Sequence, residues 1–451
     1  MSPAVPITSR PKDIGIKRYV VASLLGNALE WDDFFLYATA AAVVFGHLFF
    51  PAGTDPLVGT LGAFAGFAVG FAARPLGGLI FGHIGDRVSR KSSLVLTISI
   101  MGIATFLMGV LPTYGQVGVL APILLIVLRI LQGVAAGGEW GGGVLLISEN
   151  SSDKRRGFFS AFSQGGINLG FVLAAGAFFL VQRMPKEQFM TWGWRLPFLF
   201  SIVLFGVGIY VRFRLPESNE FKDAKTDATR PRIPVLAAIR SHPKAILVTM
   251  GLRVAENGGS YLITSFSIVY GVHVGIDPGI LLSGVALSMV FEFGAILFFG
   301  DLSDKVGRRK VYAFGAAALA VMAFPFFALL DTKTPVLIIL AFFIGNGICH
   351  AAMIGPQPAF FHELFPPEIR YSGMSLGHEL ASVLAGGLAP LIATALLINY
   401  HSSAPVSIYM IILGAVTLTA LAFSRKIGRS GTSQKDELWR GAVAVKETIT
   451  Q

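Results

Sequence analysis

The chain has 451 residues, of which 53% are hydrophobic and only 14% are charged, and its mean hydropathy is +0.67. A soluble domain of this size needs much more charged surface, so the composition excludes an ordinary soluble protein. The net charge of +10 falls in short clusters between apolar runs, which is typical of membrane topology signals and not of nucleic-acid binding.

Twelve apolar runs are long enough to cross a bilayer, which takes roughly 20 helical residues. They cover residues 20–48, 57–83, 92–112, 118–148, 157–182, 193–213, 244–273, 279–300, 311–330, 335–361, 371–398 and 404–424. A polar stretch divides six runs from six. The sequence therefore predicts an all-α membrane protein with a terminal segment 1–19, a six-helix bundle 20–213, a linker 214–243, a second bundle 244–424 and a tail 425–451.

The positions of Lys and Arg predict the orientation, because cytoplasmic loops carry an excess of both. One side receives Lys17, Arg18, Arg87, Arg90, Lys91, Lys154, Arg155, Arg156, Lys305, Arg308, Arg370 and Arg425, and the opposite loops hold Arg183, Lys186, Arg195 and Lys333. We therefore expect both termini, the linker and the tail to be cytoplasmic, with the chain in a bacterial-type inner membrane.

A loop pattern occurs twice, once after the second run and once after the eighth. Residues 82–91 read GHIGDRVSRK and residues 300–309 read GDLSDKVGRR. A second echo follows, since Glu149 precedes Arg156 by the same interval that separates Glu363 from Arg370. Matched loops predict two similar halves related by a pseudo-two-fold axis along the membrane normal.

The repeated loop resembles the signature of the major facilitator superfamily, G-x-L-A-D-R-x-G-R-K, with Ser89 where the family usually has glycine. Stretches within 26–34, 74–78, 129–139, 194–198, 215–221 and 386–390 resemble its metabolite:proton symporter branch, with Asp32 in place of an aromatic residue. That branch includes transporters of α-ketoglutarate, citrate, shikimate and proline/betaine. The resemblance implies the fold of the superfamily and a transport function.

The resemblance also implies a gate, in which charged loop residues bridge neighbouring span ends in one conformation and release them in another. The residues that match this role are Gly82, Asp86, Arg87, Arg90, Asp304 and Arg308, with Glu149 and Glu363 as expected partners.

Charged residues inside the predicted spans are the candidates for coupling, because a charge at mid-bilayer costs about 2.5 to 3.5 kcal/mol and persists only where it pairs or faces water. Glu30 and Asp33 share one helical face. A rise of about 1.5 Å per residue puts Asp33 near the midplane, at the depth of Arg129 in the fourth span. We expect Asp33 to accept the proton, with Arg129 as its electrostatic partner and Glu30 nearby. A static ion pair between spans one and four is the alternative.

Arg74 lies in an apolar context and suits a substrate carboxylate, because its guanidinium presents a planar fork of donors. Pairing with Glu30 or with span-end carbonyls is an equally open alternative. The other candidate substrate ligands are Glu139, Arg253, Glu256, Asn257, Tyr261, Glu292 and Glu379. For Glu139 a helix-locking contact, and for Arg253 a pair with Glu256, are alternatives. His350 and His378 are interpreted as structural histidines.

We expect proton-coupled symport of a small organic solute, most readily a carboxylate, by a monomer in the lipid bilayer, with substrate and proton as its partners. Two alternatives remain open: the substrate is a zwitterionic osmolyte of the proline or betaine type, or the protein is a uniporter or exchanger without proton coupling. An enzyme is disfavoured, since H-E-x-x-H and G-x-S-x-G are absent, and so is an ATP-driven pump without G-x-x-x-x-G-K-[ST]. Neither a cofactor nor a metal is expected. The sequence does not identify the substrate, the proton stoichiometry or the preferred direction of transport.

Overall fold

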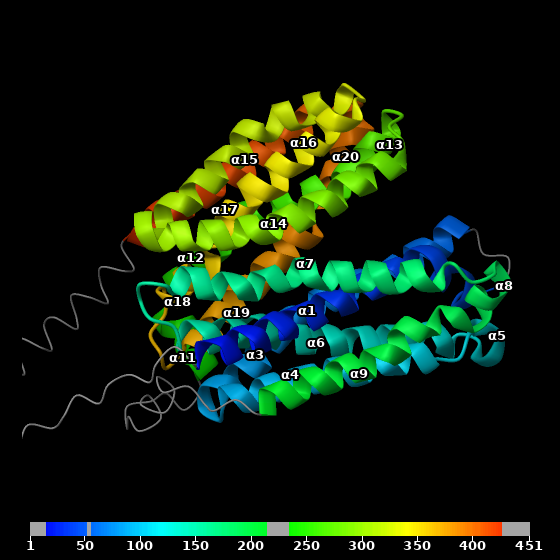
Figure 1. Ribbon diagram of the computed structural model, residues 1–451, viewed down its shortest axis with the longest axis horizontal. Coiled ribbons are helices and arrows are strands. Elements are labelled where there is room, and N and C mark those ends of the chain that lie inside the picture. The colour runs from blue at the N-terminus through cyan, green and yellow to red at the C-terminus, as the bar shows by residue number, and fades with distance from the viewer. Residues whose placement is uncertain (1–14, 52–55, 214–233, 426–451) are drawn as a thin grey trace, which may run out of the picture.

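The computed structural model describes residues 15–51, 56–213 and 234–425, and at residues 42, 56–65 and 67 it describes the backbone only. Most of the predicted terminal segment 1–19 and of the tail 425–451 lies outside these ranges, as does much of the linker. Within them the regular secondary structure is entirely helical (Figure 1).

The first half of the chain contains six long helical stretches. Its elements are α1 (Ile16–Ala40), η1 (Ala41–Phe45), α2 (Gly46–Leu48), α3 (Pro56–Arg87), α4 (Arg90–Val110), α5 (Tyr114–Val117), α6 (Leu120–Ser148), α7 (Arg156–Val181), α8 (Lys186–Gln188), η2 (Phe189–Gly193) and α9 (Arg195–Phe213).

The second half contains six more, three of them interrupted by π-helical segments. Its elements are α12 (Pro243–Tyr261), η3 (Leu262–Phe266), α13 (Ser267–His273), α14 (Pro278–Val306), α15 (Arg308–Asp331), α16 (Pro335–Ile344), η4 (Gly345–His350), α17 (Ala351–Ile354), α18 (Gln357–His362), α19 (Arg370–Ala381), η5 (Ser382–Gly387), α20 (Ala389–Tyr400) and a last helix, Ala404–Arg425. Between the halves, part of the predicted linker forms a helix, α11 (Pro234–Ser241), which packs on α3 and α19.

Each predicted span is covered by a long helical stretch. Nine helices in the described ranges are long and apolar enough to cross a membrane. The remaining stretches are those of α1, α3 and α12. Charged residues interrupt the apolar character of two of these, with Glu30 and Asp33 in α1 and Arg253 and Glu256 in α12. These helices supply much of the polar interior described below.

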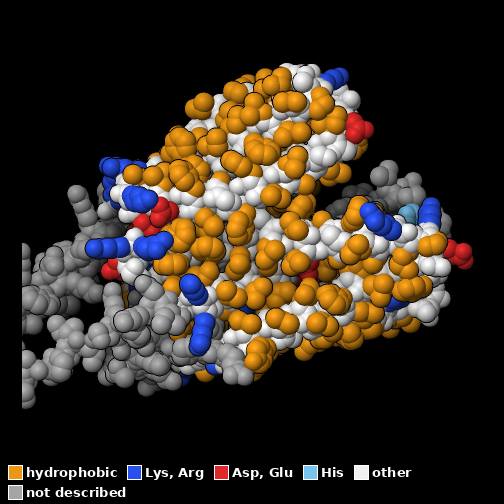
Figure 2. Space-filling view, viewed as in Figure 1, with side chains coloured by type: hydrophobic (Ala, Val, Ile, Leu, Met, Phe, Trp, Pro, Cys, Tyr) orange, Lys and Arg blue, Asp and Glu red, His pale blue; other side chains and the backbone are white. Residues whose placement is uncertain are grey.

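The two halves converge at one end of the molecule and separate toward the other (Figure 1). The converging end carries the repeated loops 82–91 and 300–309, and we call it the motif end. At the opposite, open end, α13 and α8 lie apart on different halves, and the surface is hollowed between them (Figure 2).

The flanks of the molecule are covered by hydrophobic side chains, and most visible Lys and Arg side chains gather at the motif end (Figure 2). Leu180, Val321 and Leu391 illustrate the apolar flanks, with exposed fractions of 65%, 74% and 66%. So large an exposed apolar surface fits contact with lipid and not with water. The helices therefore lie across the membrane with the open end at one surface and the motif end at the other.

Glycine makes the contact between α3 and α6 possible. A Cβ atom added to Gly77 would lie 1.9 Å from the carbonyl oxygen of Val134, and one added to Gly137 would lie 1.9 Å from that of Arg74. Small residues let helix backbones approach this closely in membranes. The contact fixes the depth at which α3 presents Arg74.

Gly137→Ala should therefore destabilise the protein, because the added methyl meets a backbone atom that cannot move aside. Overpacking of this kind costs about 1 to 3 kcal/mol, and the melting temperature of purified protein in detergent measures it. Gly176→Ala in α7 is the matched control, since no atom lies within 4 Å of the added Cβ. Equal melting temperatures for the two variants would contradict the packing argument.

Candidate functional site

Arg74 of α3 forms the central charged contact between the halves. Its Nη2 atom lies 2.7 Å from Oε1 of Glu30 in α1, and its Nε atom lies 2.6 Å from Oε2 of Glu379 in α19. All three side chains are buried, and Glu379 also contacts His378 Nδ1 at 2.7 Å. The pairing of Arg74 with Glu30 is one of the alternatives that the sequence left open. The pairing with Glu379, which joins the first half to the second, had no sequence signal.

Asp33 and Arg129 lie in the same buried network within the first half, and Gln132 connects them. Gln132 Nε2 donates to Asp33 Oδ2 at 2.7 Å, and Arg129 Nη1 donates to Gln132 Oε1 at 3.0 Å. The other oxygen of Asp33 accepts a hydrogen bond from Thr105. The guanidinium of Arg129 also lies 4.3 Å from the ring centres of Phe34 and Tyr37, a cation–π arrangement. Sequence reasoning did not single out Gln132 as a site residue.

Glu139 lies in a different network, which locks helices of the first half together. Arg212 of α9 forms an ion pair with it and donates from Nη1 to its Oε2 atom at 2.9 Å, while Thr97 of α4 donates to the same atom at 2.8 Å. A Cβ on Gly26 would collide with the guanidinium of Arg212, so α1 has glycine where this pair needs space. The geometry matches the helix-locking alternative for Glu139.

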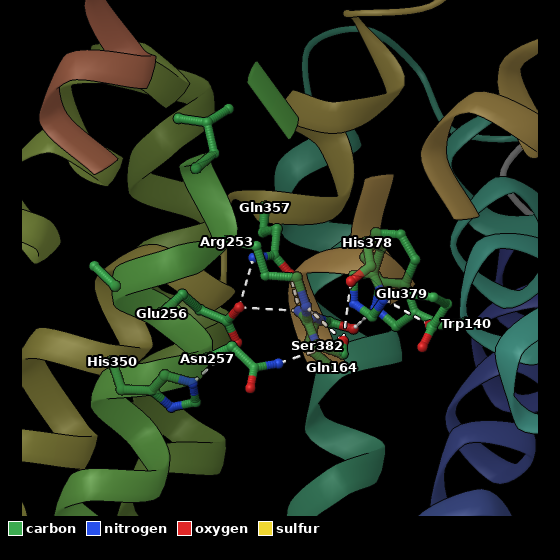
Figure 3. A network of polar contacts seen from close by, with 12 residues as sticks. Trp140, Gln164, Arg253, Glu256, Asn257, His350, Gln357, His378, Glu379 and Ser382 are labelled. Carbon is green, nitrogen blue, oxygen red and sulfur yellow. Dashed lines mark hydrogen bonds and ion pairs between the residues drawn. The ribbon is translucent and has the colours of Figure 1, made fainter. Parts of the chain in front are cut away.

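The second half has its own buried cluster around Glu256 (Figure 3). Arg253 Nη1 lies 2.9 Å from Glu256 Oε2, the local pair that the sequence left open as an alternative. His350 contacts Glu256 on one side and Glu292 on the other. Gln357 donates to Glu256 at 3.0 Å. The structure thus joins two of the predicted substrate ligands, Glu256 and Glu292, through a histidine that the sequence analysis treated as structural.

Asn257 and Tyr261, further along α12, face the boundary between the halves. The Tyr261 ring packs edge-on against Phe71 of the first half, with ring centres 6.2 Å apart. Asn257 Nδ2 donates to Ser382 Oγ at 3.5 Å, and its Oδ1 atom is buried without a hydrogen-bond partner among the described residues. These positions suit a polar ligand that enters between the halves.

Trp140 connects this region to the first half. Its ring stacks on His378 with centres 3.6 Å apart and planes 15° apart, and its Nε1 atom donates to Gln164 Oε1 at 2.9 Å. In the sequence, the feature that points to Trp140 is its place in the glycine-rich stretch 137–143. There the backbone lets α19 come close, and Tyr371 Oη donates to Gly138 O at 2.5 Å.

At the motif end, the repeated acidic residues bind helix N-termini of the opposite half. Asp86 accepts from the backbone N–H groups of Tyr371 and Ser372 at 3.2 and 2.8 Å, at the start of α19. Asp304 accepts from those of Gly157 and Phe158 at 2.8 and 2.9 Å, at the start of α7. Free N–H groups and the helix dipole favour a carboxylate at such ends.

Arginine residues of the repeated loops complete these contacts. Arg90 pairs with Glu149 and donates to Pro367 O at 3.2 Å, and Arg308 pairs with Glu363 and with Asp304 at 3.1 Å. The predicted gate residues that join these contacts are Asp86, Arg90, Glu149, Asp304, Arg308 and Glu363. Gly82 lies against Ser372 of α19, whereas Arg87 is exposed at the end of α3.

Comparison with known proteins identifies the class. The family model of the Major Facilitator Superfamily matches residues 24–390 and 285–447. The chain belongs to the major facilitator superfamily, within the metabolite:proton symporter branch that its motifs indicated.

Two relatives and one solved structure carry the comparison further. The chain is 40% identical over 421 residues to the shikimate transporter of Escherichia coli (strain K12), covering 91% of this chain and 95% of that protein. It is 38% identical over 429 residues to the inner membrane metabolite transport protein YhjE of the same organism, covering 93% and 95%. The structure of the proton:xylose symporter XylE bound to 6-bromo-6-deoxy-D-glucose superposes with a TM-score of 0.74 at 16% identity, covering 92% of this chain and 96% of that chain.

These matches confirm a multi-pass transporter of the bacterial inner-membrane type and not an enzyme. The likeness to XylE confirms the fold of the superfamily.

The contacts of Asp86 predict that Asp86→Asn opens the motif end. Hydrogen bonds to a charged group contribute about 1.5 to 3 kcal/mol, so the closed state should lose about tenfold or more in population. Ser375 is fully buried between the halves, and labelling of Ser375→Cys by a membrane-impermeant thiol reagent, in a Cys349→Ser background, measures the opening.

Asp301→Asn is the matched control, because Asp301 pairs with exposed Lys305 in its own helix and surface pairs of this kind contribute little. Labelling should accelerate in Asp86→Asn and stay unchanged in Asp301→Asn. Equal labelling rates in all three proteins would show that Asp86 does not hold the halves together.

Proposed function

We propose that the chain is a proton-coupled symporter of a small organic acid and works by alternating access between its two halves. The observation that carries this proposal is the position of Arg74 between Glu30 of the first half and Glu379 of the second. A movement that separates the halves must break the contact with Glu379. The cost of that step depends on the charges that remain around Arg74.

The charges around Arg74 give a physical reason for coupling. Two carboxylates share one guanidinium, and a buried site favours electrical neutrality because isolated charges lose their hydration. A proton on one carboxyl group frees one edge of Arg74, and a substrate carboxylate can then occupy it. Glu30 Oε2 is buried and lacks a hydrogen-bond partner within the described ranges, so it is the position we assign to that proton. Glu379, His378 and Tyr261 are the other titratable groups near Arg74.

Asp33 and Arg129 form the second part of the proposed coupling path. Both are fully buried, and Gln132 between them bonds to each. Movement of Gln132 out of the gap would let Arg129 approach Asp33, and its return would separate the two. Asp33 would hold its proton when separated and release it when Arg129 approaches, because a nearby cation favours the ionised carboxylate.

The arrangement of the halves supports alternating access. The motif end is closed by contacts that involve helix N-termini, whereas the halves separate at the open end (Figure 1). We assign the motif end, both termini and the linker to the cytoplasm from the distribution of Lys and Arg. In this assignment the described conformation is closed toward the cytoplasm. Each half moves as one body, and a monomer is sufficient for the cycle.

A carboxylate fits the site better than a betaine. Recognition of a quaternary ammonium uses open aromatic faces, but the guanidinium of Arg74 already lies 5.2 Å from the Phe34 ring centre and 5.6 Å from that of Phe71. A ligand carboxylate instead finds Arg74 once a proton has released it. The similarity to a shikimate transporter supports the same substrate class.

Uptake into liposomes of purified protein tests the proposal. Shikimate, other small hydroxylated acids, dicarboxylates, proline and glycine betaine are compared with and without an imposed pH gradient. We expect accumulation of one acid, driven by the gradient and abolished by a protonophore. Uptake of that acid unaffected by the gradient would favour a uniporter or exchanger, and uptake of betaine or proline alone would favour the osmolyte alternative.

Asp33→Asn should abolish accumulation against a gradient while preserving exchange of internal for external substrate, because the variant keeps the site but cannot release a proton. Counterflow and gradient-driven uptake measure the two activities in the same liposomes. Asp32→Asn, which removes the adjacent buried carboxyl group, is the control and should retain accumulation. Gradient-driven accumulation by Asp33→Asn would exclude Asp33 as a coupling residue.

Arg74→Lys should weaken substrate binding about tenfold or more, since an ammonium group lacks the planar fork that binds Glu379 and, in place of a protonated Glu30, a substrate carboxylate. The concentration dependence of exchange measures this loss. Arg240→Lys, in α11 outside the spans, is the control and should behave as the unmodified protein does. Unchanged affinity in Arg74→Lys would place substrate binding elsewhere.

A further inference from the structure

His350 lies between two acidic side chains at the end of the π-helical segment η4. Its Nδ1 atom contacts Glu292 Oε1 of α14, and its Nε2 atom lies 3.2 Å from Glu256 Oε1 of α12. His350 is 7% exposed. A π-helical turn is a feature often found at functional sites, and here it ends at His350, whose two ring nitrogens both face carboxylates.

The hydrogen-bond chemistry of this triad of His350, Glu256 and Glu292 requires an extra proton. A neutral imidazole has one N–H and can donate to one carboxylate only, and the second carboxylate would then face a nitrogen lone pair. A proton shared by the triad satisfies both contacts. It also neutralises the cluster, since two carboxylates would otherwise face the single charge of Arg253.

The surroundings add few other titratable groups. Arg253, Glu256 and Tyr261 belong to α12, and Glu292 belongs to α14. The helix α15 contributes Tyr312, whose hydroxyl accepts from Gln357 at 3.2 Å and donates to Leu252 O at 2.9 Å. The helices α16 and α17 that also pack on η4 carry no charged residue. From the first half, α7 contributes the neutral amide of Asn168.

We propose that the triad of His350, Glu256 and Glu292 is a second proton-binding site, separate from Glu30 and Asp33, and that its proton holds the halves in the described conformation. The inference that this proton takes part in transport rests on the proposed symport function. Binding of the proton itself does not.

Two contacts connect the triad to the first half through α7. Asn168 Nδ2 donates to Glu292 Oε2 at 3.1 Å and to Met289 O at 2.8 Å. Gln357, which donates to Glu256, also accepts from Gln164 Nε2 at 3.4 Å. Loss of the proton leaves Glu256 and Glu292 repelling each other across a neutral ring, and either carboxylate moves away at the expense of its contact with α7.

The same contacts continue through Trp140 and His378 to Glu379 (Figure 3), which contacts Arg74. Gln164 accepts from Trp140, Trp140 stacks on His378, and His378 bonds to Glu379, which holds Arg74. The triad and the central ion pairs are therefore linked by neighbouring side chains. A proton at His350 can bias the same movement that a proton at Glu30 permits.

The first experiment uses the proton alone as ligand. Potentiometric titration of purified protein in lipid nanodiscs compares the unmodified chain with His350→Gln from mildly acidic to strongly alkaline pH. We expect the unmodified protein to bind one more proton than the variant in this range. A flat difference curve over this whole range would overturn the proposal, because a histidine that takes up and releases no proton gives that result.

The second experiment measures coupling in liposomes, with the acid that the uptake comparison identifies and the membrane potential held at zero. His350→Gln should sustain a substrate gradient about tenfold smaller for each unit of imposed pH gradient, which is the effect of losing one coupled proton. Accumulation equal to that of the unmodified protein would show that the triad's proton is not transported. If the unmodified protein ignores the pH gradient, the symport proposal fails, and the titration still decides whether the triad binds a proton.

Two further variants guard against a merely structural effect. Ser288→Ala removes the 2.8 Å hydrogen bond from Asn346 of η4 to Ser288 of α14, the two elements that also carry His350 and Glu292. This variant should match the unmodified protein in both experiments. Glu292→Gln/His350→Gln removes both charges together and should restore folding where the single variant unfolds, again with one proton fewer. Loss of exchange in the folded double variant would contradict a role limited to proton binding.

Discussion

The structure depends on one constraint, which is that a charge inside the membrane must be neutralised at every stage of movement. Arg74 meets it with one carboxylate from its own half and one from the opposite half. If both partners came from the first half, the ion pair would be static and would stabilise a helix contact, as Arg212 and Glu139 do. Because the two partners lie on different halves, a change in the relative position of the halves also changes the charge balance around Arg74.

The contacts at the motif end are of a different kind. Asp86 and Asp304 bind backbone N–H groups. The distances from the Asp304 oxygens to the two nitrogens, 2.8 and 2.9 Å, are those of ordinary charge-assisted hydrogen bonds. Water can replace such partners when the halves part, because helix ends are hydrated readily. The motif end can therefore open without stranding a charge in the lipid, whereas the central ion pairs require a proton or a substrate to replace the broken contact.

Sequence reasoning predicted what depends on local spacing. Apolar runs indicated the spans, the repeated loops indicated charged contacts at both copies of the motif, and a spacing of three residues offered the pair of Arg253 with Glu256 as an alternative to substrate binding. It did not predict Glu379 as a partner of Arg74, Arg212 as a partner of Glu139, or Gln132 between Asp33 and Arg129. These contacts depend on which helices pack together and at what depth, and neither property follows from the period of one helix.

His350 shows why that limit matters for function. In the sequence it is one histidine in an apolar run, and its environment is decided by α12 and α14, which are far from it along the chain. Both acidic partners would be destabilising if they faced each other alone, and each is tolerated because the other residues of the cluster supply hydrogens. The cluster is thus stable in one protonation state and strained in the other. Placed against α7 of the opposite half, such a cluster makes the packing between the halves sensitive to proton binding, without any direct contact with substrate.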